Sequence, residues 1–346
     1  AHDQTITGEG TVKIDGDITG MVDLTSIAVT NLTFQTGDEE TNTVAITGDG
    51  ELTLTSTMAD EVTMTGDGIV NITGLDENSD VDLSDLSADL DVVASITART
   101  ELQTLSADQF ASIDTYEMSQ NTTLILNNDQ VSGTSVVLEP GASSAELVIN
   151  GGVVAGINLS GVTINTVIVD ITADTDLSDN ETLDVVTRFN VRGGAELTLS
   201  AGQADGRDVV ATETGSSVVL TGIEENLDAD LSGVSGDNVT LGISASANSR
   251  ELTFSGESLG TAKVTIGVGT TLVVAADVAS GRTISGDGSL FVTHVTADTD
   301  LRKVSKLFVA GFTGDYAPEN WTQVTEPESE GAFNQALLAF YSVHDN

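Results

Sequence analysis

The sequence predicts an all-β fold, a β-solenoid resembling a parallel β-helix, with a C-terminal cap. Three observations favour it: a β-type composition, short strand-like units, and two repeats that agree on one longer period. Aromatic residues make up only 4% of the chain, while 35 glycines supply tight corners. Tandem β-sandwich domains are the alternative, although a sandwich core normally holds more aromatic side chains.

The first repeat is a turn of the form apolar-Thr-Gly-acid-Gly, followed by residues that alternate between apolar and polar. Its copies are Ile6–Gly10, Ile46–Gly50, Met64–Gly68 and, with Ser for Thr, Ile284–Gly288. The step from Gly48 to Gly66 is 18 residues, close to the length of one solenoid coil. Alternation with period two indicates a half-buried strand, so each copy predicts a strand, a turn and another strand.

The second repeat is a strand that leads into a short polar corner. It occurs at 123–126, 196–201 and 271–276. The leucines at its second position, Leu124, Leu197 and Leu272, recur at nearly equal intervals of roughly 75 residues, which is several solenoid coils.

The third repeat is the phrase Thr172–Leu177, which recurs unchanged at Thr296–Leu301. A degenerate copy, Thr97–Leu102, precedes Thr172–Leu177 by the same interval that separates the leucines of the second repeat. Two independent patterns therefore indicate a superperiod of roughly 75 residues, built from strand units of roughly 20 residues, the length of one solenoid coil.

The predicted organisation has three parts. Residues 1–15 are an N-terminal segment and a candidate assembly strand, and residues 16–310 are the repetitive β domain. Residues 311–346 are a C-terminal cap or docking segment, because the repeats end after Leu301 and Ala332–Tyr341 has helical periodicity. A solenoid needs its open end covered, and a cap can also serve as a contact with a neighbouring subunit.

The net charge is −43, from 11 Lys+Arg against 54 Asp+Glu. Nucleic acids and anionic membranes carry the same sign of charge, so neither is an expected partner. No apolar run approaches the ~18–20 residues of a membrane span. The chain opens Ala1-His2-Asp3 without Met, and we expect an extracellular or cell-surface protein whose leader peptide has been removed.

Calcium is the one cofactor that the sequence suggests, because stacked turns can gather carboxylate and carbonyl oxygens. The candidate ligands are Asp49, Asp67 and Asp287 in the Gly-acid-Gly turns, and Asp174, Asp176, Asp298 and Asp300 in the repeated phrase. The alternative is structural: each aspartate can form an Asx turn at a solvated corner.

Catalytic motifs are absent from the sequence, and we expect no enzymatic activity. Cysteine is lacking, and the three histidines fit no triad or zinc spacing. Asp298 and Asp300, near His294 in the sequence, imitate the carboxylate set of a polysaccharide-degrading β-helix enzyme. A chain this acidic would also place carboxylates near a histidine by chance. A polysaccharide-degrading β-helix enzyme is therefore only the third functional alternative.

The Gly-Asp-Gly turns, the Leu-Thr-Leu-Ser strand and the Thr-Ala-Asp-Thr-Asp-Leu phrase resemble the repeats of large bacterial surface proteins. That group includes adhesins and surface-layer or extracellular-matrix proteins, and the resemblance covers residues 5–310. It implies a structural subunit of an extracellular layer or filament, whose partner is a second copy of itself. The alternative is an adhesin segment that binds glycans or another surface.

Overall fold

The computed structural model describes residues 6–35, 42–60, 62–75, 81–103, 106–151, 155–222, 229–236, 239–243, 251–254, 263–268, 271–293 and 300–304. The chain divides into two compact units, Ala1–Val169 and Asp170–Asn346. We describe each unit by itself.

Unit 1 is built of short strands and brief helical corners. Its strands are β1 (Ile6–Asp15), β2 (Met21–Asp23), β3 (Ile27–Gln35), β4 (Thr43–Ile46), β5 (Glu51–Thr55), β6 (Thr63–Gly66), β7 (Ile69–Thr73), β8 (Asp91–Ile96), β9 (Thr100–Glu101), β10 (Thr115–Met118), β11 (Thr123–Leu126), β12 (Ser135–Leu138) and β13 (Glu146–Asn150). Its helical segments are α1 (Ser56–Ala59), the 3-10 turn η1 (Ala107–Phe110) and α2 (Asn128–Val131). Strand β14 (Thr166–Ile171) contains the boundary with unit 2.

Unit 2 continues the same pattern. Its strands are β15 (Thr175–Asp176), β16 (Arg188–Val191), β17 (Glu196–Ser200), β18 (Asp208–Ala211), β19 (Ser217–Thr221), β20 (Val234–Gly236), β21 (Val239–Ile243), β22 (Glu251–Phe254), β23 (Lys263–Ile266), β24 (Thr271–Ala275), β25 (Ile284–Gly286) and β26 (Ser289–Thr293). Its helical segments are the 3-10 turn η2 (Leu183–Val185), α3 (Ala201–Ala204) and α4 (Ala276–Ala279).

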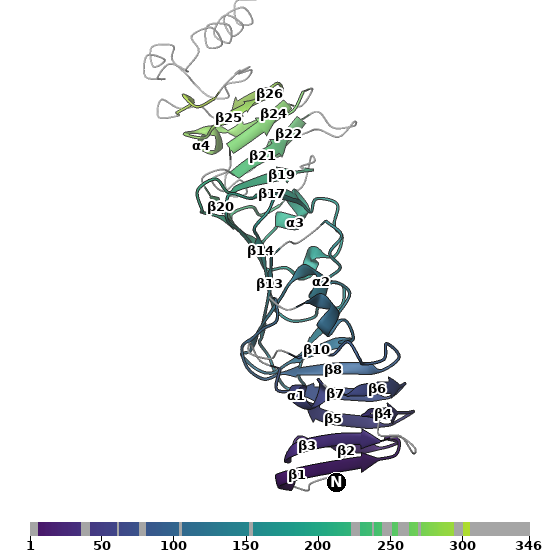
Figure 1. The fold of residues 1–346 in the computed structure, drawn as a ribbon. Coiled ribbons are helices and arrows are strands. Elements are labelled where there is room, and N and C mark those ends of the chain that lie inside the picture. Colours follow the sequence, from purple (N-terminus) through teal and green to yellow (C-terminus); the bar gives the residue numbers. More distant parts are fainter. Residues whose placement is uncertain are drawn as a thin grey trace, which may run out of the picture. The chain divides into compact units, whose positions relative to one another are not determined.

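The strands stack in parallel, each one coil above the last. In unit 1, β5 pairs with β7 so that Glu51 lies beside Ile69 of the next coil. In unit 2, β17 pairs with β19 so that Glu196 lies beside Ser217 of the next coil. Figure 1 shows β5, β7, β8 and β10 as successive layers of one sheet. This is a β-solenoid, as the sequence predicts, and the sandwich alternative is wrong.

The core lies inside the coils because alternate side chains of each strand point inward. Leu52 and Leu54 of β5, and Leu197 and Leu199 of β17, are fully buried. Their register partners in the next coil are also apolar and buried, so each coil covers the core of its neighbour.

The superperiod corresponds to the start of a new sheet. Strands β2, β9, β15 and β22 each stand at the edge of a sheet. The second strand of each of these sheets (β5, β11, β17 and β24) leads directly into a one-turn helix. The helices α1, α2, α3 and α4 begin at Ser56, Asn128, Ala201 and Ala276, so they recur at the superperiod that the sequence predicts.

The first Gly-acid-Gly copy differs from the others. Gly8-Glu9-Gly10 does not end a strand, because β1 runs through it and shifts its register against β3 between Gly8 and Thr11. A bulge accommodates the extra residue without a turn. The predicted cap at residues 311–346 lies outside the described residues.

Candidate functional site

The Gly-Asp-Gly turns of neighbouring coils are stacked through an aspartate. The Gly48 N–H donates to Oδ1 of Asp67 at 2.8 Å, across one coil step. The Asp67 and Gly68 N–H groups both donate to the Ile46 carbonyl at 3.0 Å. Asp49 and Asp67 both have exposed side chains, and Asp67 binds the backbone of the preceding turn.

At two of these turns, the glycine before the aspartate is needed because the neighbouring coil is very close. Gly66 has φ +114°, and a Cβ added there would lie 1.9 Å from the Ile46 carbonyl oxygen. Gly286, before Asp287, repeats this geometry with φ +111° and a distance of 2.2 Å to the Ile266 oxygen. Asp287 is exposed, like Asp49 and Asp67. The recurring signal therefore has a packing cause at both sites.

The two aspartates of the phrase Thr172–Leu177 bind different backbone groups. Asp174 Oδ1 accepts the Glu196 N–H at 2.9 Å, one coil further on. Asp176 Oδ1 accepts the Ser178 N–H at 3.0 Å and its hydroxyl at 2.7 Å, which is an Asx turn. These hydrogen bonds lower the pKa of Asp176.

In the second copy of the phrase, the structure describes Asp300, while Asp298 and His294 lie outside the described residues. Asp300 Oδ1 accepts the Arg302 N–H at 3.1 Å, and its Oδ2 accepts from the Arg302 guanidinium at 2.6 Å. The hydrogen bonds from Arg302 lower the pKa of Asp300 to about 2. Asp300 thus forms an Asx turn, and its carboxylate also forms an ion pair with Arg302.

Among the described residues, no group of three or more His, Asp or Glu side chains is placed to hold a metal ion. The structure brings the turns of Asp49 and Asp67 onto adjacent coils and puts Asp174 and Asp176 at one corner. It does not gather the described candidates into one cluster. Calcium binding stays a prediction.

The sequence analysis missed a recurring bond between the corner helices and the coil that follows. The C-cap residue of each helix accepts, through its side-chain oxygen, the N–H of an Asp or Asn in the next coil. These corner bonds join Asp60 to Asp82 (2.6 Å), Ser132 to Asn158 (3.0 Å), Asp205 to Asp230 (2.6 Å) and Ser280 to Asp300 (2.9 Å). The phrase Asp/Asn-Leu-Ser at 82–84, 158–160 and 230–232 was the available signal.

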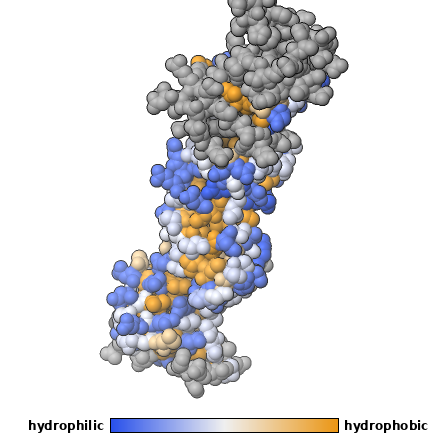
Figure 2. All heavy atoms as spheres, turned by 180° about the vertical axis from the view of Figure 1, so that it is seen from behind, coloured by the Kyte–Doolittle hydropathy of each residue, from blue (hydrophilic) through white to orange (hydrophobic). Residues whose placement is uncertain are grey.

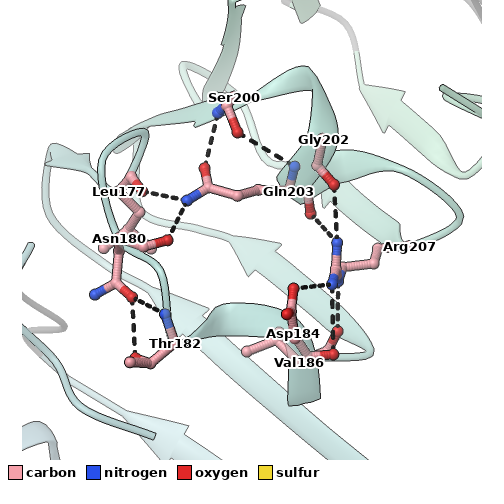
Figure 3. A network of polar contacts seen from close by, with 9 residues as sticks. All are labelled: Leu177, Asn180, Thr182, Asp184, Val186, Ser200, Gly202, Gln203 and Arg207. Atoms are coloured by element: carbon pink, nitrogen blue, oxygen red, sulfur yellow. Dashed lines mark hydrogen bonds and ion pairs between the residues drawn. The ribbon is translucent and has the colours of Figure 1, made fainter. Parts of the chain in front are cut away.

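Around α3, a second set of side chains ties three segments of unit 2 together (Figure 3). Gln203 and Ser200 form a capping box, and Gln203 Nε2 also donates to the carbonyls of Leu177 and Asn180, each at 2.7 Å. Arg207, whose side chain is only 14% exposed, donates to the carbonyls of Gln203 and Val186 at 2.7 and 2.9 Å. Most acceptors of these donors are backbone carbonyls, and Arg207 also forms an ion pair with Asp184 at 3.5 Å, so the network holds the three segments together.

In the first described coil, two core positions are less buried than their partners in the next coil. Ile14 of β1 and Val22 of β2 are half-buried, whereas their register partners Phe34 and Leu52 are 1% and 0% exposed. Met21, beside Val22, is 61% exposed. Among the described strands, β1 pairs with β3 alone and β2 with β5 alone. Each therefore has a sheet edge with no described partner.

A further apolar surface lies on the outer side of the sheet that holds β13. Val148 faces outward between the buried Leu147 and Ile149, and Ile168 faces outward on the neighbouring β14. Both are half-buried. Figure 2 shows one face of the molecule, on which hydrophobic side chains reach the surface between polar ones.

Comparison of the chain with models of protein families, with curated proteins and with solved structures finds no match. In the part of the chain that the structure describes, no helix has the length and apolar character of a membrane span.

Proposed function

We propose that this protein is a non-enzymatic structural subunit of an extracellular assembly, a surface layer or a filament, built by self-association. The observation that carries the proposal is the first described coil: its core residues Ile14 and Val22 are half-buried, Met21 is exposed, and one edge each of β1 and β2 has no partner among the described strands. Every further coil that stacks on a solenoid end buries the core that the end exposes. A second copy of the chain supplies such a coil.

The edge of β1 supports this reading. It is ten residues long, and one of its edges has no partner among the described strands. A free strand edge is a ready template for another chain. Natural proteins usually shorten or cover such an edge when they remain monomeric.

The described acidic side chains also favour a structural role. Asp67, Asp174, Asp176 and Asp300 each accept a hydrogen bond from a backbone N–H. A catalytic pair of carboxylates would instead face a common substrate position.

The charge sets the conditions for assembly. Copies that each carry −43 repel one another, and this repulsion is screened within about 3 Å at 1 M ionic strength against about 30 Å at 0.01 M. Divalent cations screen it further. Assembly is therefore favoured by salt, and calcium acts either by screening or at one of the candidate aspartates.

Electron microscopy and sedimentation of the purified chain test the proposal, in low salt, in high salt, with millimolar calcium and after chelation. Filaments or sheets in salt or calcium support it. Their loss on chelation at constant high salt assigns calcium a specific place in the assembly. Monomers under every condition overturn the self-association.

An adhesin segment is the second candidate, favoured by the outward-facing Val148 and Ile168. Exposed apolar positions on a sheet face are typical of surfaces that bind a ligand or another protein. Such a segment stays monomeric and binds glycans or cell surfaces, and replacing Val148 with Thr weakens that binding. Glycan arrays with the purified monomer distinguish the two candidates.

A further inference from the structure

We infer that unit 2 carries a binding site for neutral glycans on the outer side of strand β16. The β16 strip forms this site and comprises Asp170, Arg188, Asn190, Arg192 and Asp208. The inference goes beyond the proposed function, because one copy can bind a glycan through this face whether or not copies associate.

Alternation along β16 places the strip on the outside of the coil. Phe189 and Val191 are buried, with 0% and 1% exposure. Arg188 and Asn190 alternate with them and therefore face outward. Arg192 directly follows the strand, and its side chain is 51% exposed. Three polar side chains thus lie in sequence along one outer surface.

Asp170 is the least exposed member of the strip. It precedes the buried Ile171 of β14 and faces the outer side, yet its side chain is only 10% exposed. Its Oδ1 accepts the Asn190 Nδ2 at 2.7 Å and lies 3.6 Å from the Arg192 guanidinium, too far for a hydrogen bond. Burial of a carboxylate is costly unless such partners compensate it. Asn190 and Arg192 therefore hold this carboxylate in place before a ligand arrives.

The strip retains hydrogen-bonding groups that its own contacts do not use. Within the described part of the chain, the Arg192 guanidinium, Asp170 Oδ2 and Asn190 Oδ1 form no hydrogen bond. These groups are donors and acceptors side by side, and a sugar hydroxyl both donates and accepts. Val210, half-buried beside Asn190 in the register, adds apolar surface for the C–H groups of a sugar ring.

The charges of the strip cancel, which favours a neutral ligand. Arg192 forms an ion pair with Asp170, and Arg188 donates to Asp208 at 3.0 Å. A metal ion would be repelled by the guanidinium groups. A polyanion would gain no net attraction from the strip and would be repelled by the rest of a chain with a net charge of −43. Neutral hydroxyl groups can bind while both ion pairs stay intact.

Affinity electrophoresis of the full chain tests the site. The strip has no aromatic side chain for a sugar to stack on, so a polymer that repeats the sugar is the suitable probe. Native gels contain dissolved dextran, mannan or galactan as neutral probes, or polygalacturonate as an anionic probe. At least one neutral polysaccharide should retard the wild type, and polygalacturonate should not.

Removal of one guanidinium measures its contribution. Arg192→Gln should raise the dissociation constant for the neutral polysaccharide about tenfold or more, because charged donors are lost. The matched control is Arg99→Gln in unit 1, which makes the same change in net charge. Arg99 is also exposed and also forms an ion pair, with Glu101. This control should bind like the wild type.

A change of charge at Asp170 separates ligand binding from a structural role. Asp170→Asn keeps the size of the side chain and leaves Arg192 without its counter-charge. At 0.15 M ionic strength, repulsion from carboxylates more than about 8 Å away is largely screened. This variant should therefore gain retardation by polygalacturonate and lose retardation by the neutral polysaccharide. A purely structural role would lower the thermal unfolding midpoint without creating anion binding.

The outcomes are distinct. Weaker neutral binding by Arg192→Gln, together with polygalacturonate binding by Asp170→Asn, supports the site. The inference is overturned if none of the three neutral polysaccharides retards the wild type, or if Arg192→Gln binds like Arg99→Gln. Loss of neutral binding in both strip variants without any gain of polygalacturonate binding assigns the strip a structural role and also overturns it. None of these results depends on self-association, which microscopy and sedimentation measure.

Discussion

At the scale of single residues, glycine and aspartate determine the corners of the coils. At position 66, only glycine combines a positive φ with the absence of a Cβ that would collide with the Ile46 carbonyl. The Asp67 carboxylate accepts the Gly48 N–H of the preceding turn. The Gly-acid-Gly repeat predicted three of these turns correctly, whereas β1 runs through the first copy at 8–10. It did not predict what the carboxylates bind, because several of the donors lie one coil away and the coil length varies from corner to corner.

Replacing Gly66 with Ala should destabilise the fold by about 2 kcal/mol or more, because φ is positive there and the added Cβ meets the Ile46 carbonyl oxygen. Gly74→Ala is the matched control, since Gly74 has φ +72° but nothing within 4 Å of an added Cβ. Urea unfolding of both variants measures the difference. Equal losses would show that the close approach of the coils has no energetic effect.

Stability should fall in acid through the Asx turns. Hydrogen bonds from Ser84, Ser178, Ser232 and Arg302 lower the pKa values of Asp82, Asp176, Asp230 and Asp300. A folded-state pKa below the unfolded value gives stability that is complete above about pH 4 and is lost as pH falls through the folded-state pKa. For Asp300 that window extends from about pH 4 to about pH 2.

The measurement is the urea midpoint between pH 7 and pH 2 for the wild type and for a variant with Asn at these four positions. Asparagine keeps the oxygen that accepts the backbone N–H and does not titrate. The variant should lose less stability than the wild type below pH 4. Parallel curves would show that the Asx turns do not contribute to acid sensitivity.

At the scale of elements, the strands were predictable and the corner helices were not. Alternation in 51–55 and 196–200 predicts β5 and β17, because inward and outward positions differ in polarity. The four-residue helices are too short for any helical periodicity to show. The available signal was the cap: Ser200 with Gln203, and Asn127 with Gln130, each form a capping box.

The helix α4 lacks such a cap, since its N-cap residue is Ala275. Ala275→Thr should stabilise the protein by about 1 kcal/mol, because Thr55 at the matching position of α1 accepts the Met58 N–H. Ala275→Val is the control, with nearly the same shape and no oxygen. Thermal unfolding should rank the Thr variant above both the wild type and the Val variant.

The side chain of Gln203 both caps α3 and binds backbone carbonyls of the preceding coil. Gln203→Ala should destabilise unit 2 by about 2 kcal/mol, because it removes the capping box and leaves the Leu177 and Asn180 carbonyls without this donor. Hydrogen exchange should show faster opening of α3 and of β17. Glu181→Ala, at an exposed position of the same unit, should have little effect. Equal effects of the two variants would contradict the role of Gln203 in joining coils.

At the scale of the whole molecule, composition and repeats predicted the solenoid. They did not reveal that each superperiod begins a new sheet, because sheet membership depends on which strands of neighbouring coils pair. The proposed assembly is likewise a property of the whole chain, since association must overcome the mutual repulsion of copies that each carry a net charge of −43.

Salt should raise the unfolding temperature of the monomer as well as promote assembly. Raising the ionic strength from 0.01 M to 1 M shortens the screening length from about 30 Å to about 3 Å and relieves repulsion within each chain. Calorimetry at a protein concentration at which sedimentation shows only monomers separates this effect from association. A midpoint that does not rise with salt would show that the charges are spaced too widely to oppose folding.

The parallel register of β17 and β19 has a consequence for evolution and design. Glu196 and Ser217 occupy the same place on successive coils, so residues 196–216 form one interchangeable length of chain. Removing or duplicating such a length leaves the cut ends in the same place on the coil and changes the stack by one strand spacing, about 4.8 Å. Insertions or deletions of whole coils, which arise readily in repetitive genes, would therefore change the length of the stack in steps of one strand spacing.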